Sequence, residues 1–253
     1  MNRYTDREIM AIRAGRLIRD GDILFAGTGV AMLAATVAKR IHAPKAVVFF
    51  ETGGIDPVLH ELPMAVADPR VMHGTCLNSG LIEAFSIVGH RKLHTIAFLG
   101  AAQIDRFGNI NSTCIGNYPK PRVRFSGSGG ACDAASLASA VIVFMQHEKE
   151  KLVERLDYLT SPGWLQGGDS RTKAGLVRGG PLAVVTNLGI MKFDERTKAM
   201  YLAEYYPGVS LGQIAENTGF EMDVSMATEA LPPSDEELRI LRDEVDPQRL
   251  ILG

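Results

Sequence analysis

A single carboxylate, Glu51, ends an apolar run and is followed by a glycine-containing turn. The run, residues 46–50, is rich in Val and Phe and is bounded by Pro44 and by Gly53-Gly54, which is typical of a buried parallel strand. Proteins of the α/β class bind ligands at the carboxyl ends of such strands, and glycines let a substrate approach the backbone. Glu51 could therefore act as a nucleophile or a general base, although a solvated glutamate that merely ends the strand is the simpler interpretation.

Two glycine-rich turns offer backbone N–H donors. The first, Gly27-Thr28-Gly29, separates an expected strand, 23–26, from an expected helix, 31–40. N–H groups at the start of a helix can hold an anion such as a phosphate. The segment has neither a full dinucleotide-binding pattern nor the lysine of a P-loop, so a plain tight turn fits it equally well.

The second turn, Gly127-Ser128-Gly129-Gly130, precedes another expected helix, 134–138. Its consecutive donors could stabilise an oxyanion, with Gly127, Gly129 and Gly130 as the candidates. If this turn lies opposite Glu51, the two supply a nucleophile and an oxyanion hole, which acyl transfer requires. A flexible loop without a chemical role is the alternative.

Four further polar side chains are candidates for ligand contacts. Lys120, Arg122 and Arg124 alternate with apolar residues, so an extended segment would place the three cations on one face, where they could bind phosphate or carboxylate. An ordinary solvated face is the alternative. Gln103 follows an expected buried strand, 94–99, and its amide could donate to an oxyanion or orient a carboxylate. A hydrogen bond within a turn would explain Gln103 as well.

Size and composition are those of an ordinary globular protein. The chain has 253 residues, of which 46% are hydrophobic and 22% charged, and its 27 Lys and Arg nearly balance 29 Asp and Glu. This balance argues against nucleic acid or a membrane surface as the partner. The cysteines at 76, 114 and 132 lack metal-ligand spacing. We expect reduced thiols, no metal and a cytoplasmic location, because neither a secretory signal nor an apolar stretch of about 20 residues is present.

The elements that must position these residues begin as an alternation of strands and helices. A capping box at Thr5 and Glu8 predicts a helix that runs to about Asp20. The strand, turn and helix around Gly27 then lead to the strand that ends at Glu51. This βαβ order implies a parallel sheet with right-handed crossovers.

The later segments are more varied. We expect loops and short helices over 56–93, a long polar turn over 100–111, and an antiparallel hairpin from strands 182–186 and 190–193. A capping box at Ser234 predicts a C-terminal helix. The expected fold is of the α/β class: a mainly parallel open sheet flanked by helices, with antiparallel additions in the C-terminal half, in a single domain over 1–253.

These dispersed segments resemble one family nearly from end to end. The chain is similar to the B (beta) subunits of the type I CoA-transferases, and within that family to the glutaconate CoA-transferase branch. The similar segments are 27–29, 37–40, 51–53, 100–116, 125–131, 145–149, 160–164, 192–194 and 205–207.

The resemblance implies roles for the candidate residues. The family's glutamate, at the position of Glu51, attacks an acyl-CoA thioester, and the reaction passes through a mixed anhydride to a glutamyl-CoA thioester. Many relatives have Asn after this glutamate, whereas this chain has Thr52, and the glutaconate branch has a small hydroxyl residue there. Coenzyme A is then a substrate, with no bound cofactor expected. The candidate CoA-binding residues are Gly27, Thr28, Gly29, Lys120, Arg122 and Arg124.

The resemblance also implies a second, homologous alpha subunit that completes the acyl pocket. We expect the chain to be inactive alone and to form a heterodimer or a dimer of heterodimers. The expected reaction moves CoA between an acyl-CoA, such as a dicarboxylic, glutaconyl-like one, and a free carboxylate. The same fold allows an acyl-CoA hydrolase with Glu51 as a general base for water, or a C–C hydrolase or decarboxylase that acts on a CoA ester. A non-catalytic binding subunit is a third hypothesis.

Overall fold

The computed structural model describes residues 4–253, which divide into two compact units. The first unit contains the described residues up to Phe98 together with Pro232–Gly253, and the second contains Leu99–Leu231. The C-terminal segment therefore belongs to the same unit as Glu51. A single domain over 1–253 stays a prediction.

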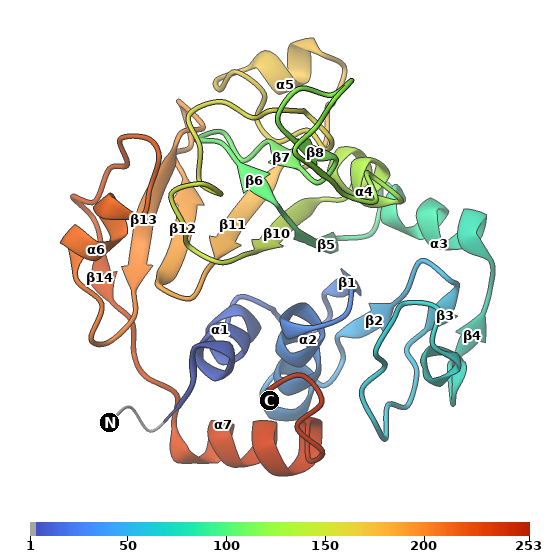
Figure 1. Cartoon of the computed structure of the whole chain (residues 1–253). Helices are drawn as coiled ribbons and strands as arrows, with labels where there is room; N and C mark the ends of the chain where they lie inside the picture. The colour runs from blue at the N-terminus through green and yellow to red at the C-terminus, as the bar shows by residue number, and fades with distance from the viewer. Residues whose placement is uncertain (1–3) are drawn as a thin grey trace. The chain divides into compact units, whose positions relative to one another are not determined.

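Three parallel strands form the centre of the first unit (Figure 1). They are β1 (Ile23–Phe25), β2 (Val47–Phe49) and β5 (Thr95–Gly100), and β1 pairs in parallel with each of the other two. Leu24 and Ile96 are almost fully buried, as expected for strands covered on both faces. The predicted parallel βαβ arrangement is confirmed.

Two short antiparallel strands, β3 (Gly54–Ile55) and β4 (Leu77–Asn78), extend this sheet beyond β2. Ile55 of β3 lies opposite Phe49 of β2, so the residues between them form the turn of a hairpin. Neither strand was expected, because a two-residue strand leaves no periodic pattern in the sequence. The turn that carries Glu51 therefore leads into a returning strand.

The helices predicted for 56–93 are present but short. They are a 3₁₀ helix, Pro69–Met72, and α3 (Leu81–Val88). Asp68 caps the 3₁₀ helix with its side chain, and Pro69 occupies its first position, which suits proline because that position needs no N–H donor.

Three larger helical elements pack in the first unit: α1 (Asp6–Gly15), α2 (Val30–Ile41), and α7 (Asp235–Arg239), which continues into a π-helical segment, Ile240–Val245. Figure 1 shows α1 beside α2. Gly15 permits this close packing, because a Cβ at that position would lie 3.1 Å from Cγ1 of Val37. Both predicted capping boxes are present.

The predicted end of the first helix is wrong: α1 ends at Gly15, not near Asp20. Past that point the N–H groups of Leu17 and Ile18 bond to carbonyls three residues back, which tightens the chain into turns. The carboxylate of Asp22 then accepts the N–H of Arg19 at 2.8 Å. This local side-chain bond competes with continued helix.

The second unit is built on five strands: β10 (Ala140–Phe144), β11 (Pro181–Val185), β12 (Gly189–Phe193), β13 (Met200–Tyr205) and β14 (Thr228–Glu229). The pairs β10–β11 and β13–β14 are parallel, whereas β11–β12 and β12–β13 are antiparallel. The predicted antiparallel hairpin is therefore confirmed, and so is the fold class.

Two small hairpins complete the second unit. They pair β6 (Gln103–Ile104) with β7 (Ile110–Asn111), and β8 (Cys114–Ile115) with β9 (Val123–Arg124). The segment 100–111 is thus a hairpin rather than the long polar turn expected. The Asp105 carboxylate closes it by accepting N–H groups from Phe107 and Asn109. The unit's helices are α4 (Ala131–Leu137), α5 (Ser170–Lys173) and α6 (Leu211–Glu216).

No helix within residues 4–253 is long and apolar enough to cross a membrane.

Candidate active site

Glu51 lies in the turn of the β2–β3 hairpin. The turn is closed by two backbone hydrogen bonds, from Phe50 N to Gly54 O at 3.0 Å and from Gly53 N to Phe50 O at 2.9 Å. The Glu51 side chain is half-buried, and its carboxylate makes no hydrogen bond or ion pair with any residue of 4–253. A carboxylate that no neighbouring group engages is free to react with a ligand.

Ser79, which lies between β4 and α3, forms hydrogen bonds to this turn. Ser79 donates its N–H to the carbonyl oxygen of Gly53 at 2.9 Å and its hydroxyl to the same oxygen at 3.1 Å. Gly53 has φ +99°, and a Cβ there would lie 2.0 Å from the carbonyl oxygen of Ser79. Only glycine fits both the backbone conformation and this close contact.

Thr52 fastens the other side of the turn. Its Oγ1 donates to the carbonyl oxygen of Val66 at 2.9 Å. The hydroxyl residue that stands where many relatives of the resembled family have Asn therefore holds the turn to the segment before the 3₁₀ helix. The turn that carries Glu51 is therefore restrained by other segments at Thr52 and at Gly53.

The Gly27-Thr28-Gly29 turn starts from the strand next to β2. Ala26, just before it, donates its N–H to the carbonyl oxygen of Phe49 at 3.0 Å. The structure therefore brings this turn and the Glu51 turn to the same edge of the sheet, where parallel strands have their carboxyl ends. Thr28 and Gly29 also line a pocket of about 330 Å³, whose other lining residues are Arg7, Val30, Pro63, Met64, Leu250 and Ile251.

The Gly127-Ser128-Gly129-Gly130 turn leads directly into α4. The N–H of Gly127 is bound to the carbonyl oxygen of Ser112 at 3.1 Å, so this donor is occupied. The N–H groups of Gly129 and Gly130 have no acceptor among residues 4–253. No heavy atom lies within 4 Å of a Cβ built at Gly127 or Gly129, so this part of the turn is open.

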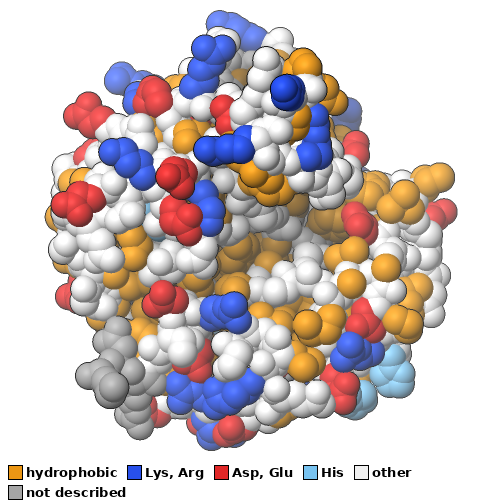
Figure 2. Space-filling view, viewed as in Figure 1, with side chains coloured by type: hydrophobic (Ala, Val, Ile, Leu, Met, Phe, Trp, Pro, Cys, Tyr) orange, Lys and Arg blue, Asp and Glu red, His pale blue; other side chains and the backbone are white. Residues whose placement is uncertain are grey.

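The three candidate cations differ in their surroundings. Arg124 lies in β9, whereas Lys120 and Arg122 precede this strand. Arg124 donates to the carbonyl oxygen of Tyr118 at 2.6 Å and stacks over its ring. The side chains of Lys120 and Arg122 make no hydrogen bond or ion pair within 4–253. Figure 2 shows several exposed Lys and Arg side chains over the β8 region of the second unit.

Gln103 is buried and fully engaged. Its Nε2 donates to Oδ2 of Asp157 at 3.0 Å, and its Oε1 accepts from Nδ2 of Asn111 at 2.7 Å and from N of Asp157 at 3.1 Å. These are the structural hydrogen bonds that the sequence left open as the alternative. A role of Gln103 at an oxyanion stays a prediction.

The potential metal-ligating side chains of residues 4–253 do not form a cluster. Cys76, Cys114 and Cys132 are free thiols, and no group of three His, Cys, Asp or Glu side chains within 4–253 is placed to hold a metal ion.

Sequence reasoning missed the residues that hold the Glu51 turn in place. Thr52 and Ser79 are ordinary hydroxyl residues with no recognisable spacing, and their partners are backbone carbonyls. The one usable signal was Asp68-Pro69-Arg70, because Asp followed by Pro is a common start of a helical turn.

Comparisons with known proteins agree with this architecture. Residues 7–217 match the family model described as Coenzyme A transferase. The B subunit of glutaconate CoA-transferase from Acidaminococcus fermentans is 43% identical over 96% of this chain and 93% of its own length. The B subunit of 3-oxoadipate CoA-transferase from Pseudomonas knackmussii is 35% identical over 96% of this chain and 94% of its own length.

A solved structure is similar over almost the whole chain. The crystal structure of glutaconate coenzyme A-transferase from Acidaminococcus fermentans superposes with a TM-score of 0.96 at 41% identity, covering 99% of this chain and 98% of that one. The chain therefore belongs to the coenzyme A transferase family. The resemblance found in the sequence, and the enzyme class it implies, are confirmed.

Proposed function

We propose that this chain is the B-type subunit of a CoA-transferase that moves CoA between an acyl-CoA and a free carboxylate, with Glu51 as the covalent nucleophile. The observation that carries this proposal is the unengaged Glu51 carboxylate at the carboxyl end of β2, in a chain of the coenzyme A transferase family. Both relatives are named as the B member of a set of subunits, which supports a separate A-type (alpha) partner, in a heterodimer or a dimer of heterodimers.

The first half of the proposed reaction converts the thioester of the donor acyl-CoA into a thioester between Glu51 and CoA. A Glu51 oxygen attacks the thioester carbonyl, the C–S bond breaks, and CoA leaves as a thiolate, which gives a mixed anhydride. The thiolate then attacks the Glu51 carbonyl carbon and expels the donor carboxylate. The product is a glutamyl-CoA thioester and one free carboxylate.

The second half runs the same steps in reverse with the acceptor. The acceptor carboxylate attacks the glutamyl thioester and releases the CoA thiolate, which attacks the acceptor's acyl carbon. The new acyl-CoA leaves, and the Glu51 carboxylate is regenerated. No water or redox partner enters, so one thioester is formed for each thioester consumed.

The remaining site residues have proposed roles that follow from their chemistry. Gly129 and Gly130, with unoccupied N–H groups, donate to the oxyanion that forms when a carbonyl is attacked, and Gly127 allows the backbone turn. Gly27, Thr28 and Gly29 hold part of CoA, and the cations at 120, 122 and 124 bind its phosphates. CoA is a substrate, and no other cofactor is proposed.

The substrate class is proposed from the names of the relatives. Glutaconate and 3-oxoadipate are both dicarboxylic acids, and the two subunits named for them match nearly the full length of this chain. We infer a dicarboxylic acyl group, with a small monocarboxylate such as acetate as the other partner.

The test is a labelled exchange with the assembled complex. The chain is co-expressed with an A-type subunit, and glutaconyl-CoA is mixed with deuterated acetate. We expect deuterated acetyl-CoA to form while the total thioester concentration stays constant, and we expect the Glu51→Ala complex to form none. Thioester loss that needs no acetate would instead show a hydrolase, and full activity in Glu51→Ala would show a non-catalytic subunit.

A further inference from the structure

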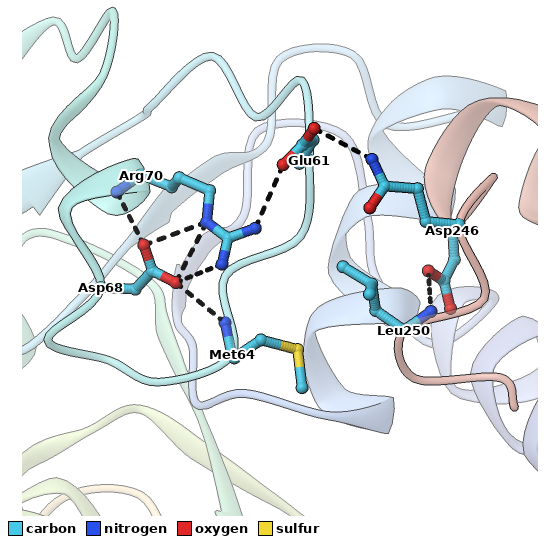
Figure 3. Close-up of polar contacts among 7 residues, drawn as sticks. Glu61, Met64, Asp68, Arg70, Asp246 and Leu250 are labelled. Atoms are coloured by element: carbon cyan, nitrogen blue, oxygen red, sulfur yellow. Dashed lines mark hydrogen bonds and ion pairs between the residues drawn. The ribbon is translucent and has the colours of Figure 1, made fainter.

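A polar network ties the segment around Arg70 to the C-terminal end of the first unit (Figure 3). Nε2 of Gln248 donates to Oε1 of Glu61 at 2.9 Å. Nη1 of Arg70 donates to the other oxygen of the same carboxylate at 3.3 Å. Glu61 therefore joins the C-terminal segment to a residue of the 3₁₀ helix.

Arg70 also forms an ion pair with Asp68. Its Nη2 donates to Oδ2 of Asp68 at 2.7 Å and its Nε donates to Oδ1 at 3.0 Å. These hydrogen bonds from Arg70 hold the pKa of the Asp68 carboxyl below its usual range. The same carboxylate accepts the N–H of Met64 at 3.2 Å, so residues 64–68 form a closed loop.

One backbone carbonyl of the 64–68 loop contacts the turn that carries Glu51. That carbonyl belongs to Val66 and accepts the hydroxyl of Thr52, the residue directly after Glu51. A continuous series of contacts thus runs from Gln248 through Glu61, Arg70 and the loop to Thr52. We call this series the Gln248–Thr52 network.

The far end of the network is itself held firmly. The buried carboxylate of Asp246 accepts the N–H groups of residues 250, 251 and 252 at 2.8–2.9 Å. Three charge-assisted hydrogen bonds fold the last residues into a compact turn next to Gln248. These hydrogen bonds hold the C-terminal segment in a defined conformation beside Gln248.

We propose that the Gln248–Thr52 network positions Glu51, with Thr52 as the main positioning residue and the C-terminal segment as its outer support. The inference rests on the proposed function, because it assigns these contacts to the reacting turn. None of the residues involved needs to touch the substrate. The network acts by restricting where the carboxylate can point when the thioester arrives.

The expected effects follow from the exposure of each link. The Thr52 hydrogen bond is partly buried and adjoins the reacting group, so Thr52→Val should lower kcat about tenfold. Thr52→Ser keeps the hydroxyl and should recover most of the activity. The Gln248 link is exposed, so Gln248→Ala should lower kcat only about twofold to threefold. In all three variants the KM for acyl-CoA should change less than about twofold, because these contacts orient the Glu51 carboxylate and do not bind the substrate.

The test combines kinetics of the assembled complex with hydrogen exchange of the full chain. Exchange is followed in the peptide that contains residues 50–54, whose N–H groups close the hairpin turn. We expect faster exchange there in Thr52→Val and Gln248→Ala, and wild-type exchange in Thr52→Ser. Arg249→Ala is the matched control, because its exposed side chain adjoins Gln248 but makes no hydrogen bond or ion pair within 4–253.

The outcomes separate this inference from the proposed function. Wild-type kcat and wild-type exchange in Thr52→Val would overturn the positioning role while the transferase stands. Unchanged exchange in Gln248→Ala, or an equal change in Arg249→Ala, would remove the C-terminal segment from the network. A wild-type complex without transferase activity would overturn the proposed function, and exchange at 50–54 in the full chain would still decide whether the network restrains the turn.

Discussion

Ser79 holds Gly53 through two hydrogen bonds to one carbonyl oxygen, at 2.9 Å from its N–H and 3.1 Å from its hydroxyl. The contact is so close that Gly53 has no room for a side chain. Ser79 therefore fixes the backbone conformation of Gly53, which lies two residues after the proposed nucleophile Glu51. This arrangement explains why a glycine is needed in the turn that carries Glu51.

Gly53→Ala should disrupt the Glu51 turn more than any ordinary glycine substitution. The new Cβ would meet the Ser79 carbonyl at 2.0 Å in addition to the strain of a positive φ, so we expect a loss of about 2 kcal/mol or more in the free energy of unfolding. Transferase activity should fall at least about tenfold. Urea unfolding and steady-state kinetics measure the two effects.

Gly21→Ala provides the control for backbone strain alone. Gly21 belongs to the same unit and has φ +88°, but no atom lies within 4 Å of the position that a Cβ would take there. We expect a loss of about 1 kcal/mol and unchanged activity. Equal losses of stability and activity in both variants would mean that the Ser79 contact has no special importance.

The proposed CoA-binding cations should not contribute equally. Arg122 has a free guanidinium within 4–253, whereas Arg124 is engaged by Tyr118. Arg122→Ala should raise the KM for acyl-CoA about threefold to tenfold, with an effect that shrinks as salt is added. Arg124→Ala should raise it less. A KM in Arg122→Ala that equals the wild-type value at low salt would exclude this residue from phosphate binding.

Much of the fold could be predicted because its core elements carry strong local patterns. The apolar run before Glu51 and the alternation around Gly27 identify parallel strands, and Thr5 and Ser234 mark helix starts by their capping boxes. The strand β3 could not be predicted, because two residues show no period. The early end of α1 could not be predicted either. The Asp22 carboxylate accepts the N–H of Arg19, and this hydrogen bond competes with a continued helix.

The candidate site was predictable only in part, for a similar reason. Glu51 and the glycine turns carry a recognisable residue type and position, whereas their supports work through backbone carbonyls that any residue can supply. Thr52 bonds to the carbonyl of Val66, whose side chain plays no part in the contact. Gln103 is the opposite case, because its residue type and position suggested a ligand contact. Its side chain instead forms hydrogen bonds with Asp157 and Asn111.

His147 should make stability depend on pH. It is buried, with its ring nitrogens 3.1 Å from Oγ1 of Thr186 and 3.0 Å from Oγ1 of Thr218, and burial lowers its pKa from 6.5 to about 4. Between these pH values the unfolded chain binds a proton that the folded chain does not. The free energy of unfolding should therefore be highest above pH 6.5 and fall as the pH is lowered toward 4.

The size of this effect follows from the shift. Between pH 7 and pH 5 the contribution of His147 should be a loss of about 2 kcal/mol. Urea unfolding at the two pH values measures it, and His147→Asn should show a correspondingly smaller difference between them. An identical pH dependence in the variant and the wild type would assign the effect to other groups.

Arg171 should be essential for the stability of the second unit. It is 2% exposed, and its guanidinium donates to the carbonyl oxygens of Ala135 at 2.8 Å, Gly163 at 2.9 Å and Arg178 at 2.9 Å. Burial lowers its pKa. Arg171→Met removes these donors and leaves buried carbonyls without partners, so we expect a loss of about 3 kcal/mol in the free energy of unfolding.

The same helix offers a control for Arg171→Met. Lys173 is exposed and pairs with Asp169 at the surface, so Lys173→Met should change the free energy of unfolding by less than about 0.5 kcal/mol. Urea unfolding compares the two variants. Equal effects would show that the buried guanidinium contributes no more than a surface charge.

The covalent role of Glu51 is tested most directly by mass spectrometry of the assembled complex, quenched after acyl-CoA is added without an acceptor. We predict that the peptide containing Glu51 gains the mass of CoA minus water, and that an added acceptor carboxylate removes this adduct within one turnover. A Glu51 peptide that stays unmodified, in a complex that turns over acyl-CoA and acetate at full rate, would contradict it.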